Sequence, residues 1–212
     1  MTARVLPYGE RAVLVELPDL DRVLALARAL AACPPDGVEE WVPAARTVLV
    51  RFDPARTSPD RILDALADLP PAAADADDAA DAGGARPLEL AVVYDGADLD
   101  DVAALTGLSP AQVVARHEAP TYTVAFGGFT PGFGYLVGGD PVLRVPRLAT
   151  PRTRVPAGSV AIADVFTGVY PAATPGGWRL LGRTDAVLWD AARATPALLT
   201  PGRRVRFRRV ER

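Results

Sequence analysis

The chain holds few side chains of the kind that catalysis usually needs, and most of them lie in its second half. His117 is the only histidine and Cys33 the only cysteine. Because the ordinary pKa of histidine lies near neutrality, His117 is the first candidate for moving a proton. It ends a helical pattern that Ser109 and Pro110 open, and the C-terminal end of a helix dipole favours a protonated imidazole. An ordinary packing or surface histidine is the alternative.

A second set of polar side chains follows among glycines and prolines that favour tight turns. The set comprises Arg147, Arg152, Arg154, Ser159, Thr167, Tyr170, Trp178, Arg183 and Thr184. Arginine binds carboxylates and phosphates through paired N–H groups, and glycine turns let backbone amides approach an anion. A ligand that carries a carboxylate would suit this set. All 23 basic residues are arginine, so an arginine at a given position can reflect the overall composition of the chain. An ordinary ion pair is therefore the alternative for any one of these arginines.

The densest run of aromatic residues and glycines lies between these two sets, over residues 122–135. Its centre reads Gly-Phe-Thr-Pro-Gly-Phe at 128–133, so the backbone must turn sharply between two large apolar side chains. Two interpretations are open: a barrel corner whose phenylalanines fill the core, or the lining of a pocket or subunit interface. The neighbouring His117 and the arginines favour the second.

Several well-known functional motifs are absent from the sequence. The glycines do not form Gly-x-Gly-x-x-Gly, and no lysine completes a phosphate loop. One histidine and one cysteine cannot build the usual zinc sites, and the aspartates at 75–81 lack the glycine and glutamate of a calcium loop. Ser159 lacks the glycine two residues later that a nucleophile elbow requires. We therefore expect neither a metal site nor a nucleotide loop of these kinds.

Length and composition are those of a globular protein. The chain has 212 residues, of which 50% are hydrophobic and 23% charged, and its net charge is −3. This charge gives no general attraction to nucleic acid or anionic lipid, so neither a nucleic acid nor a membrane is expected as a partner. Glu10 and Arg11 stand where a signal peptide needs apolar residues, and no stretch approaches the ~18 apolar residues of a membrane helix. A cytoplasmic protein with a buried, inert Cys33 is expected.

Residues 1–84 predict a small two-layer domain that ends in a linker. Strand patterns at 4–7, 12–17, 38–42 and 47–52 alternate with helical patterns at 21–32 and 58–69, in the order ββαββα. A sheet covered on one face by two helices satisfies this order. Ala, Asp, Pro and Gly dominate residues 70–87, which contain no large apolar residue, and predict an acidic interdomain linker.

Residues 85–212 predict a β-barrel domain, and the whole chain is therefore expected to be α+β. A strand at 88–94 and two short helices at 99–105 and 110–118 come first. Strand patterns then follow at 123–126, 142–145, 158–163, 165–170, 178–184, 186–189 and 203–207. So many short strands without a long helix favour a closed or nearly closed barrel.

Five segments of the second half together resemble one protein family. They read Gly-Phe-Thr-Pro-Gly-Phe-Gly-Tyr-Leu at 128–136, Val-Pro-Arg at 145–147, Pro-Arg-Thr-Arg-Val-Pro-Ala-Gly-Ser-Val-Ala-Ile-Ala at 151–163, Thr-Gly-Val-Tyr-Pro at 167–171 and Pro-Gly-Gly-Trp-Arg-Leu-Leu-Gly-Arg-Thr at 175–184. They are similar to the family of 5-oxoprolinase B subunits, also known as allophanate hydrolase subunit 1, which includes a sporulation kinase inhibitor. Weaker similarity at 8–13 and 50–54 extends the resemblance over nearly the whole chain.

The resemblance implies a small α+β domain followed by a cyclophilin-like β-barrel. It also implies a protein that is inactive alone and works in a complex with two other proteins, a homologous barrel known as the C subunit of 5-oxoprolinase, and its A subunit. Together they would use ATP, whose site can lie wholly on a partner, to open the lactam 5-oxoproline to L-glutamate. Two other functions are open: a protein-binding inhibitor of a histidine kinase, and a subunit of an allophanate hydrolase or of a carboxyl-transfer unit like that of urea carboxylase.

The resemblance further implies which residues form the site. His117 is expected to move the proton at the opening ring nitrogen, Tyr170 to donate a hydrogen bond, and Arg152 to hold the substrate carboxylate or developing phosphate charge. The residues expected to bind substrate or to form the interface with a partner are Gly128, Phe129, Pro131, Gly132, Phe133, Arg147, Ser159, Thr167, Gly176, Gly177, Trp178, Arg183 and Thr184. Asp164 stands where glycine is usual and Phe166 where glutamine is usual, which leaves the specificity open.

Overall fold

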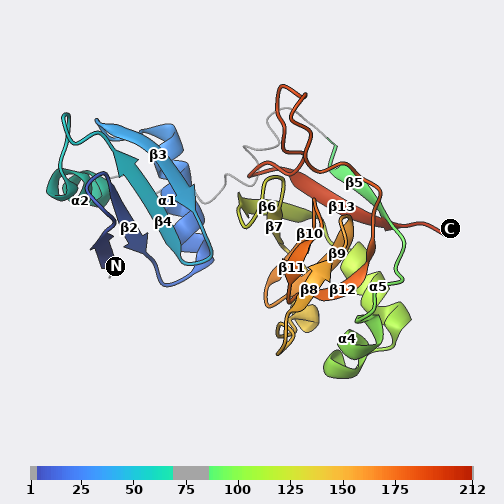
Figure 1. The fold of residues 1–212 in the computed structure, drawn as a ribbon. Helices are drawn as coiled ribbons and strands as arrows, with labels where there is room; N and C mark the ends of the chain where they lie inside the picture. The colour runs from blue at the N-terminus through green and yellow to red at the C-terminus, as the bar shows by residue number, and fades with distance from the viewer. Residues whose placement is uncertain (1–3, 69–85, 212) are drawn as a thin grey trace. The chain divides into compact units, whose positions relative to one another are not determined.

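The computed structural model describes residues 4–68 and 86–211 of the chain. The chain divides into two compact units, Met1–Gly83 and Gly84–Arg212, and each is considered by itself (Figure 1). The linker expected at 70–87 lies, apart from its last two residues, outside the described residues. No helix among the described residues is long and apolar enough to cross a membrane.

The first unit is an antiparallel sheet with two helices. Its elements are β1 (Arg4–Pro7), β2 (Ala12–Glu16), α1 (Leu20–Ala32), β3 (Val38–Pro43), β4 (Thr47–Phe52) and α2 (Pro59–Asp68), with the strands in the order β1-β2-β4-β3. The expected ββαββα order is therefore confirmed. The carboxylate of Asp19 caps α1 by accepting the N–H of Arg22 at 2.9 Å, which satisfies a free donor of the first turn.

One face of this sheet packs against both helices. Side chains alternate across a strand, so Val13 and Val15 of β2 face the same core as Val48 of β4, and Leu30 of α1 and Ile62 of α2 cover them. Their burial is complete or nearly so.

Cys33 lies differently from the expectation. It is exposed, because it ends α1 as the C-cap residue, with its N–H bonded to the carbonyl of Ala29 at 2.9 Å.

The second unit is a nearly closed barrel with short helices at one side. Its elements are β5 (Leu88–Val92), α4 (Leu99–Thr106), α5 (Pro110–Glu118), β6 (Tyr122–Gly127), β7 (Gly134–Val137), the 3-10 helix η1 (Pro141–Leu143), β8 (Arg152–Val155), β9 (Ser159–Ala163), β10 (Phe166–Val169), β11 (Thr174–Gly176), β12 (Arg179–Arg183) and β13 (Arg204–Arg209). Seven strands form one sheet in the order β12-β9-β10-β7-β6-β13-β5, and β8 pairs with β11 separately. Just beyond β5, Val93 and Arg183 exchange two backbone hydrogen bonds of 2.9 Å, which bring the edges of the sheet together. The expected fold class is confirmed.

Two of the strands expected in this unit do not form. Residues 142–145 begin within η1, and Leu143 and Val145 are buried beside α4 instead of pairing in a sheet. Residues 186–189 contribute only an isolated bridge between Trp189 and Ala197. Leu143, Val145 and Leu188 are buried in the core without strand pairing, which periodicity alone does not distinguish from a short strand.

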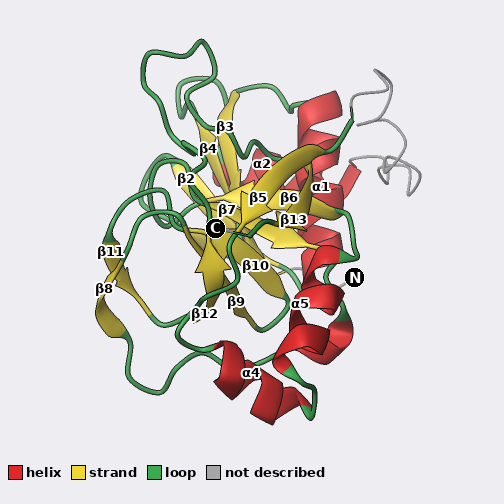
Figure 2. Cartoon of the chain, turned by 90° about the vertical axis from the view of Figure 1, so that its right-hand side faces the viewer, coloured by secondary structure: helices red, strands yellow, loops and turns green. Residues whose placement is uncertain are grey.

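Two helices position the central part of the barrel wall. Ser109 and Gln112 form a capping box at the start of α5, and Gly107 ends α4 in the left-handed conformation that glycine adopts without strain. In Figure 2 α4 and α5 lie side by side, and α5 also packs against β13. As a result, the last turn of α5 places His117 in the core of the barrel.

Candidate functional site

A connected group of aromatic side chains, here called the aromatic cluster, fills the barrel beside the glycine-rich turn. Its members are Phe126, Phe129, Phe133, Tyr135, Phe166, Tyr170 and Trp178, whose ring centroids lie 4.5 to 6.2 Å from their neighbours. Phe133 contacts four of the others. Gly168 of β10 leaves room for it, because an added Cβ would lie 2.7 Å from the ring of Phe133. The residues of the turn and of the 166–178 region are therefore brought together.

The two phenylalanines of the turn have different environments. Phe133 is buried, as expected of a barrel corner that fills the core. Phe129 is 59% exposed and has a φ of 65°, a conformation that costs a non-glycine residue energy. Its ring still contacts Phe133 and Tyr170 edge to face. Strained backbone conformations cluster at ligand-binding sites, which makes Phe129 a candidate contact for a ligand or a partner.

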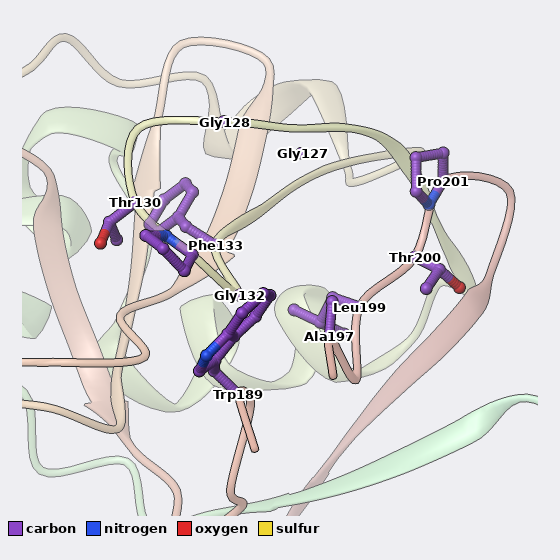
Figure 3. A pocket seen from close by; sticks show the side chains of 11 residues that line it. Gly127, Gly128, Thr130, Gly132, Phe133, Trp189, Ala197, Leu199, Thr200 and Pro201 are labelled. Atoms are coloured by element: carbon purple, nitrogen blue, oxygen red, sulfur yellow. The ribbon is translucent and has the colours of Figure 1, made fainter. Parts of the chain in front are cut away.

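A pocket of about 330 Å³ lies on the other side of the turn (Figure 3). It is lined by Gly127, Gly128, Thr130, Pro131, Gly132, Phe133, Trp189, Ala197, Leu199, Thr200 and Pro201. Gly132, with a φ of 85°, lets the turn approach the 188–199 segment, since an added Cβ would lie 2.8 Å from the Cβ of Trp189. The pocket therefore joins the expected Gly128, Pro131 and Gly132 to a segment that the sequence had not indicated.

The lining of this pocket does not suit the phosphates of ATP. None of its residues is charged. The backbone N–H groups of Gly128, Thr130 and Phe133 are used within the turn, where they bond to carbonyl oxygens at 2.7 to 3.2 Å. The lining therefore offers a phosphate no cation, and three of the turn's amides are already bonded.

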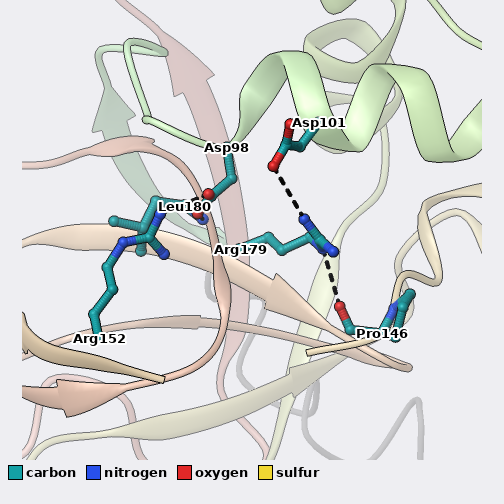
Figure 4. Close-up of polar contacts among 6 residues, drawn as sticks. All are labelled: Asp98, Asp101, Pro146, Arg152, Arg179 and Leu180. Atoms are coloured by element: carbon teal, nitrogen blue, oxygen red, sulfur yellow. Dashed lines mark hydrogen bonds and ion pairs between the residues drawn. The ribbon is translucent and has the colours of Figure 1, made fainter. Parts of the chain in front are cut away.

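Arg152 is held by a buried carboxylate. Its Nη2 donates to Oδ1 of Asp98 at 2.6 Å, and Oδ2 of Asp98 accepts the backbone N–H of Leu180 at 2.7 Å (Figure 4). Asp98 is 3% exposed and stands at the N-cap of α4 without capping it, because its carboxylate is used by these two donors. The hydrogen bond to Asp98 raises the pKa of Arg152, so the guanidinium is a fixed positive charge.

Tyr170 and Arg147 lie beside this pair. Tyr170 is buried, and burial raises the pKa of its phenol despite a backbone hydrogen bond from Trp178 and the nearby charges of Arg147 and Arg152. Nη2 of Arg147 lies 3.6 Å from the position that a Cβ on Gly177 would take, whereas an added Cβ on Gly176 would strike the ring and hydroxyl of Tyr170. The two glycines therefore allow the backbone to pass close to both side chains. Arg147, Arg152 and Tyr170 are named below the arginine–tyrosine group.

His117 lies elsewhere, in the core. It has no exposed surface, its Nδ1 is 2.8 Å from the hydroxyl of Tyr94, and its Nε2 is 3.4 Å from the hydroxyl of Thr167. Burial lowers its pKa to about 3, so the imidazole is neutral at pH 7. The expectation that His117 titrates near neutrality is wrong, because desolvation outweighs the helix dipole. Its catalytic role stays a prediction. The hydrogen bonds described for its ring go to Tyr94 and Thr167, not to the arginine–tyrosine group.

Ser159, Arg183 and Thr184 belong to the closure of the barrel. Arg183 pairs with Ser159 in the sheet, and its guanidinium donates twice to Asp95, at 2.8 and 3.0 Å. Ser159 and Thr184 are buried. These three residues support the scaffold, and their expected contact with substrate or a partner stays a prediction.

Three contributors to the site were not predicted from the sequence. Asp98 lies 54 residues from Arg152 and was not among the candidate residues. Tyr135 belongs to the aromatic stretch, which is the signal that could have indicated it. Trp189 faces the pocket from a segment expected to be a strand. No group of three or more metal-binding side chains occurs among the residues that the structure describes.

Comparison with known proteins identifies relatives of the chain. The model of the family described as "Carboxyltransferase domain, subdomain C and D" matches residues 3–199. The chain is 54% identical over 125 residues to the 5-oxoprolinase B subunit of Escherichia coli O157:H7, a match covering 58% of this chain and 57% of the relative. It is 46% identical over 125 residues to the 5-oxoprolinase B subunit of Haemophilus influenzae, covering 58% and 59%. The matches thus span less than two thirds of these relatives, and the expected family resemblance is confirmed.

Solved structures show the same fold. A protein named TTHA0988 matches with a TM-score of 0.75 at 43% identity, covering 95% of this chain and 40% of that chain. A conserved uncharacterized protein from Pyrococcus horikoshii matches with a TM-score of 0.58 at 35% identity, covering 98% of each. The urea carboxylase of Kluyveromyces lactis matches with a TM-score of 0.73 at 20% identity, covering 99% of this chain and 22% of that chain, which shows a shared fold alone.

Proposed function

The chain belongs to the family of carboxyltransferase domains, subdomains C and D, and on this premise we propose that it is the B subunit of an ATP-dependent 5-oxoprolinase. In this proposal it acts with the A and C subunits to open 5-oxoproline to L-glutamate and is inactive alone. The observation that carries the proposal is the identity of 43 to 54% with relatives named as B subunits of 5-oxoprolinase.

The geometry agrees with a subunit that binds but does not complete the chemistry. The arginine–tyrosine group offers two cations beside a phenol, whereas His117 is buried and neutral. The pocket beside the glycine turn does not suit phosphates. We therefore assign recognition of the substrate's charge to this chain, whereas the ATP site of the complex is assigned to one of its partners.

Reconstitution tests the proposal. The chain is purified alone and with candidate A and C subunits, and glutamate release from 5-oxoproline is measured with and without ATP. Release is expected only from the full set with ATP present. Release by the A and C subunits without this chain, or none by the full set, contradicts the proposal.

Carboxyl transfer is the second candidate, because the family description itself names a carboxyltransferase domain. In that case the chain would act beside a biotin-carrying partner on urea or a related amide. Carboxylation of urea that depends on biotin and on this chain, without glutamate release from 5-oxoproline, would favour this candidate over the first.

A further inference from the structure

Two buried polar side-chain atoms lack a hydrogen-bond partner among the described residues, and both lie on the small sheet of β8 and β11. They are Nη1 of Arg152 and Oγ1 of Thr174. In the pairing of these strands Arg152 lies opposite Gly176, and Thr174 opposite Val155. Buried polar groups are almost always paired, so this sheet is short of polar partners. A guanidinium nitrogen can only donate, and what Arg152 lacks is therefore an acceptor.

The arginines near this sheet are not all paired with carboxylates. Asp98 pairs with Arg152 at 2.6 Å, and Asp101 lies 3.4 Å from Arg179, whose Nε donates to the carbonyl of Pro146 at 3.0 Å (Figure 4). Arg147 makes no ion pair with any described residue, although its charge opposes the burial that raises the pKa values of Tyr135 and Tyr170. Arg152 and Arg179 therefore each have a carboxylate partner, whereas the positive charge of Arg147 has none among the described residues.

The surroundings suit a small acid with an apolar body. The charges of Arg147 and Arg152 both act on the phenol of Tyr170, whose oxygen accepts the backbone N–H of Trp178. The exposed ring of Phe129 contacts Tyr170 with centroids 6.2 Å apart. An aromatic face beside charge-assisted donors is the usual composition of a site for a small polar ligand.

We propose that Arg147, Arg152 and Tyr170 bind the carboxylate of a small organic acid whose apolar body lies against Phe129. The carboxylate accepts from Nη1 of Arg152 and from the hydroxyl of Tyr170, and it neutralises Arg147. That the acid is 5-oxoproline rests on the proposed function. The carboxylate site itself rests on the unpaired Nη1 of Arg152 and on the positive charge of Arg147, which has no partner among the described residues. Arg183, which is paired with Asp95, is not part of this site.

Binding to the purified full chain tests this inference by calorimetric titration. The probes are 5-oxo-L-proline, the neutral lactam 2-pyrrolidinone, which has the same ring without a carboxylate, and acetate. We expect saturable binding of both acids and an affinity for 2-pyrrolidinone that is lower than that for 5-oxo-L-proline by roughly tenfold or more, because charge-assisted hydrogen bonds are lost.

Matched variants locate the site. Arg147→Gln removes an exposed and unpaired cation, so the fold should persist while 5-oxo-L-proline affinity falls by roughly tenfold. Arg144→Gln is the control, because Arg144 is an exposed arginine only three residues before Arg147, and this variant should bind 5-oxo-L-proline as tightly as the parent chain. Arg152→Gln alone would leave the buried carboxylate of Asp98 without its cation and so destabilise the fold. Arg152 is therefore tested in the double variant Asp98→Asn with Arg152→Gln, which should also bind 5-oxo-L-proline more weakly.

The outcomes separate this inference from the proposed function. Equal binding of acid and neutral lactam, or unchanged affinity in Arg147→Gln, overturns the site. Failure of both acids to bind the chain also overturns it and points to a carboxylate supplied by a partner protein. Acid binding that depends on Arg147, without glutamate release by the reconstituted complex, leaves the site standing and removes the proposed reaction.

Discussion

Phe129 and Asp164 are the only non-glycine residues with a positive φ in the part of the chain that the structure describes. Phe129 pairs its strain with exposure, and we attribute this to ligand binding. Asp164, at a φ of 52°, opens the two-residue connection between β9 and β10, where Ala163 pairs with Phe166. Two-residue hairpins often need a glycine at their first position, which agrees with the glycine that the family resemblance leads us to expect there.

Replacing Asp164 by glycine should therefore stabilise the chain. We expect Asp164→Gly to raise the free energy of unfolding by roughly 0.5 to 1 kcal/mol, because the left-handed conformation carries no Cβ penalty in glycine. Chemical denaturation measures the change. Asp164→Ala is the control and should be less stable than the parent chain; a less stable Asp164→Gly would refute this account of the turn.

Phe166, the other departure from the family pattern, has a packing role. Its ring lies edge to face against Phe126 and Tyr135, with centroids 5.8 and 5.4 Å away. It therefore extends the aromatic cluster where a glutamine would have introduced hydrogen-bonding groups. Its effect on specificity stays a prediction.

The closure of the barrel depends on close backbone contact between two distant elements. An added Cβ on Gly182 of β12 would strike the carbonyl oxygen of Val93 and lie 2.9 Å from Cα of Tyr94. Both atoms belong to the backbone that follows β5, which the hydrogen bonds between Val93 and Arg183 hold in place. A side chain at Gly182 must therefore push the two edges of the sheet apart.

Gly182→Ala should consequently destabilise the second unit by roughly 1 to 3 kcal/mol, the usual cost of overpacking. Thermal or denaturant unfolding measures it. Gly127→Ala provides the comparison, because its nearest neighbour would be the carbonyl oxygen of Phe133 at 3.7 Å, an ordinary contact. We expect it to change stability by less than about 1 kcal/mol. Similar losses in both variants would show that Gly182 has no special part in closure.

At the scale of the whole molecule, the two units have separate hydrophobic cores and we propose that they unfold in separate transitions. His117, the only histidine, belongs to the second unit. Its pKa is about 3 in the folded state, below the ordinary value near 6.5. Between these values the unfolded chain binds a proton that the folded chain does not. Stability from this group is therefore present above about pH 6.5 and is lost as the pH falls toward 3.

We thus expect the second unit to lose roughly 1 kcal/mol between pH 7 and pH 5.5. The first unit, which contains no histidine, serves as the internal reference. Denaturant titrations of the full chain at the two pH values measure both transitions, and His117→Gln should abolish the difference. If His117→Gln keeps the same pH dependence, His117 is not its source. If a single transition covers both units, they do not unfold separately.

Sequence reasoning determined those features that depend on neighbouring residues. The order of strands and helices in the first unit followed from hydrophobic periodicity, which depends on residues a few positions apart. The motifs of residues 128–184 indicated the family. The strands β8 and β11 escaped prediction because they are only four and three residues long and rich in arginine, proline and glycine.

Only the tertiary structure decided which of the candidate residues act together. Packing buries His117 and keeps its imidazole neutral. It also pairs Arg152 with Asp98, 54 residues away, whereas Arg183 pairs with Asp95 where the barrel closes. Burial and electrostatic field depend on segments that are distant in the chain, whereas local pattern reports only on residues a few positions apart. For this protein, residue types and motifs could therefore be read from the sequence, while exposure, charge balance and partners required the fold.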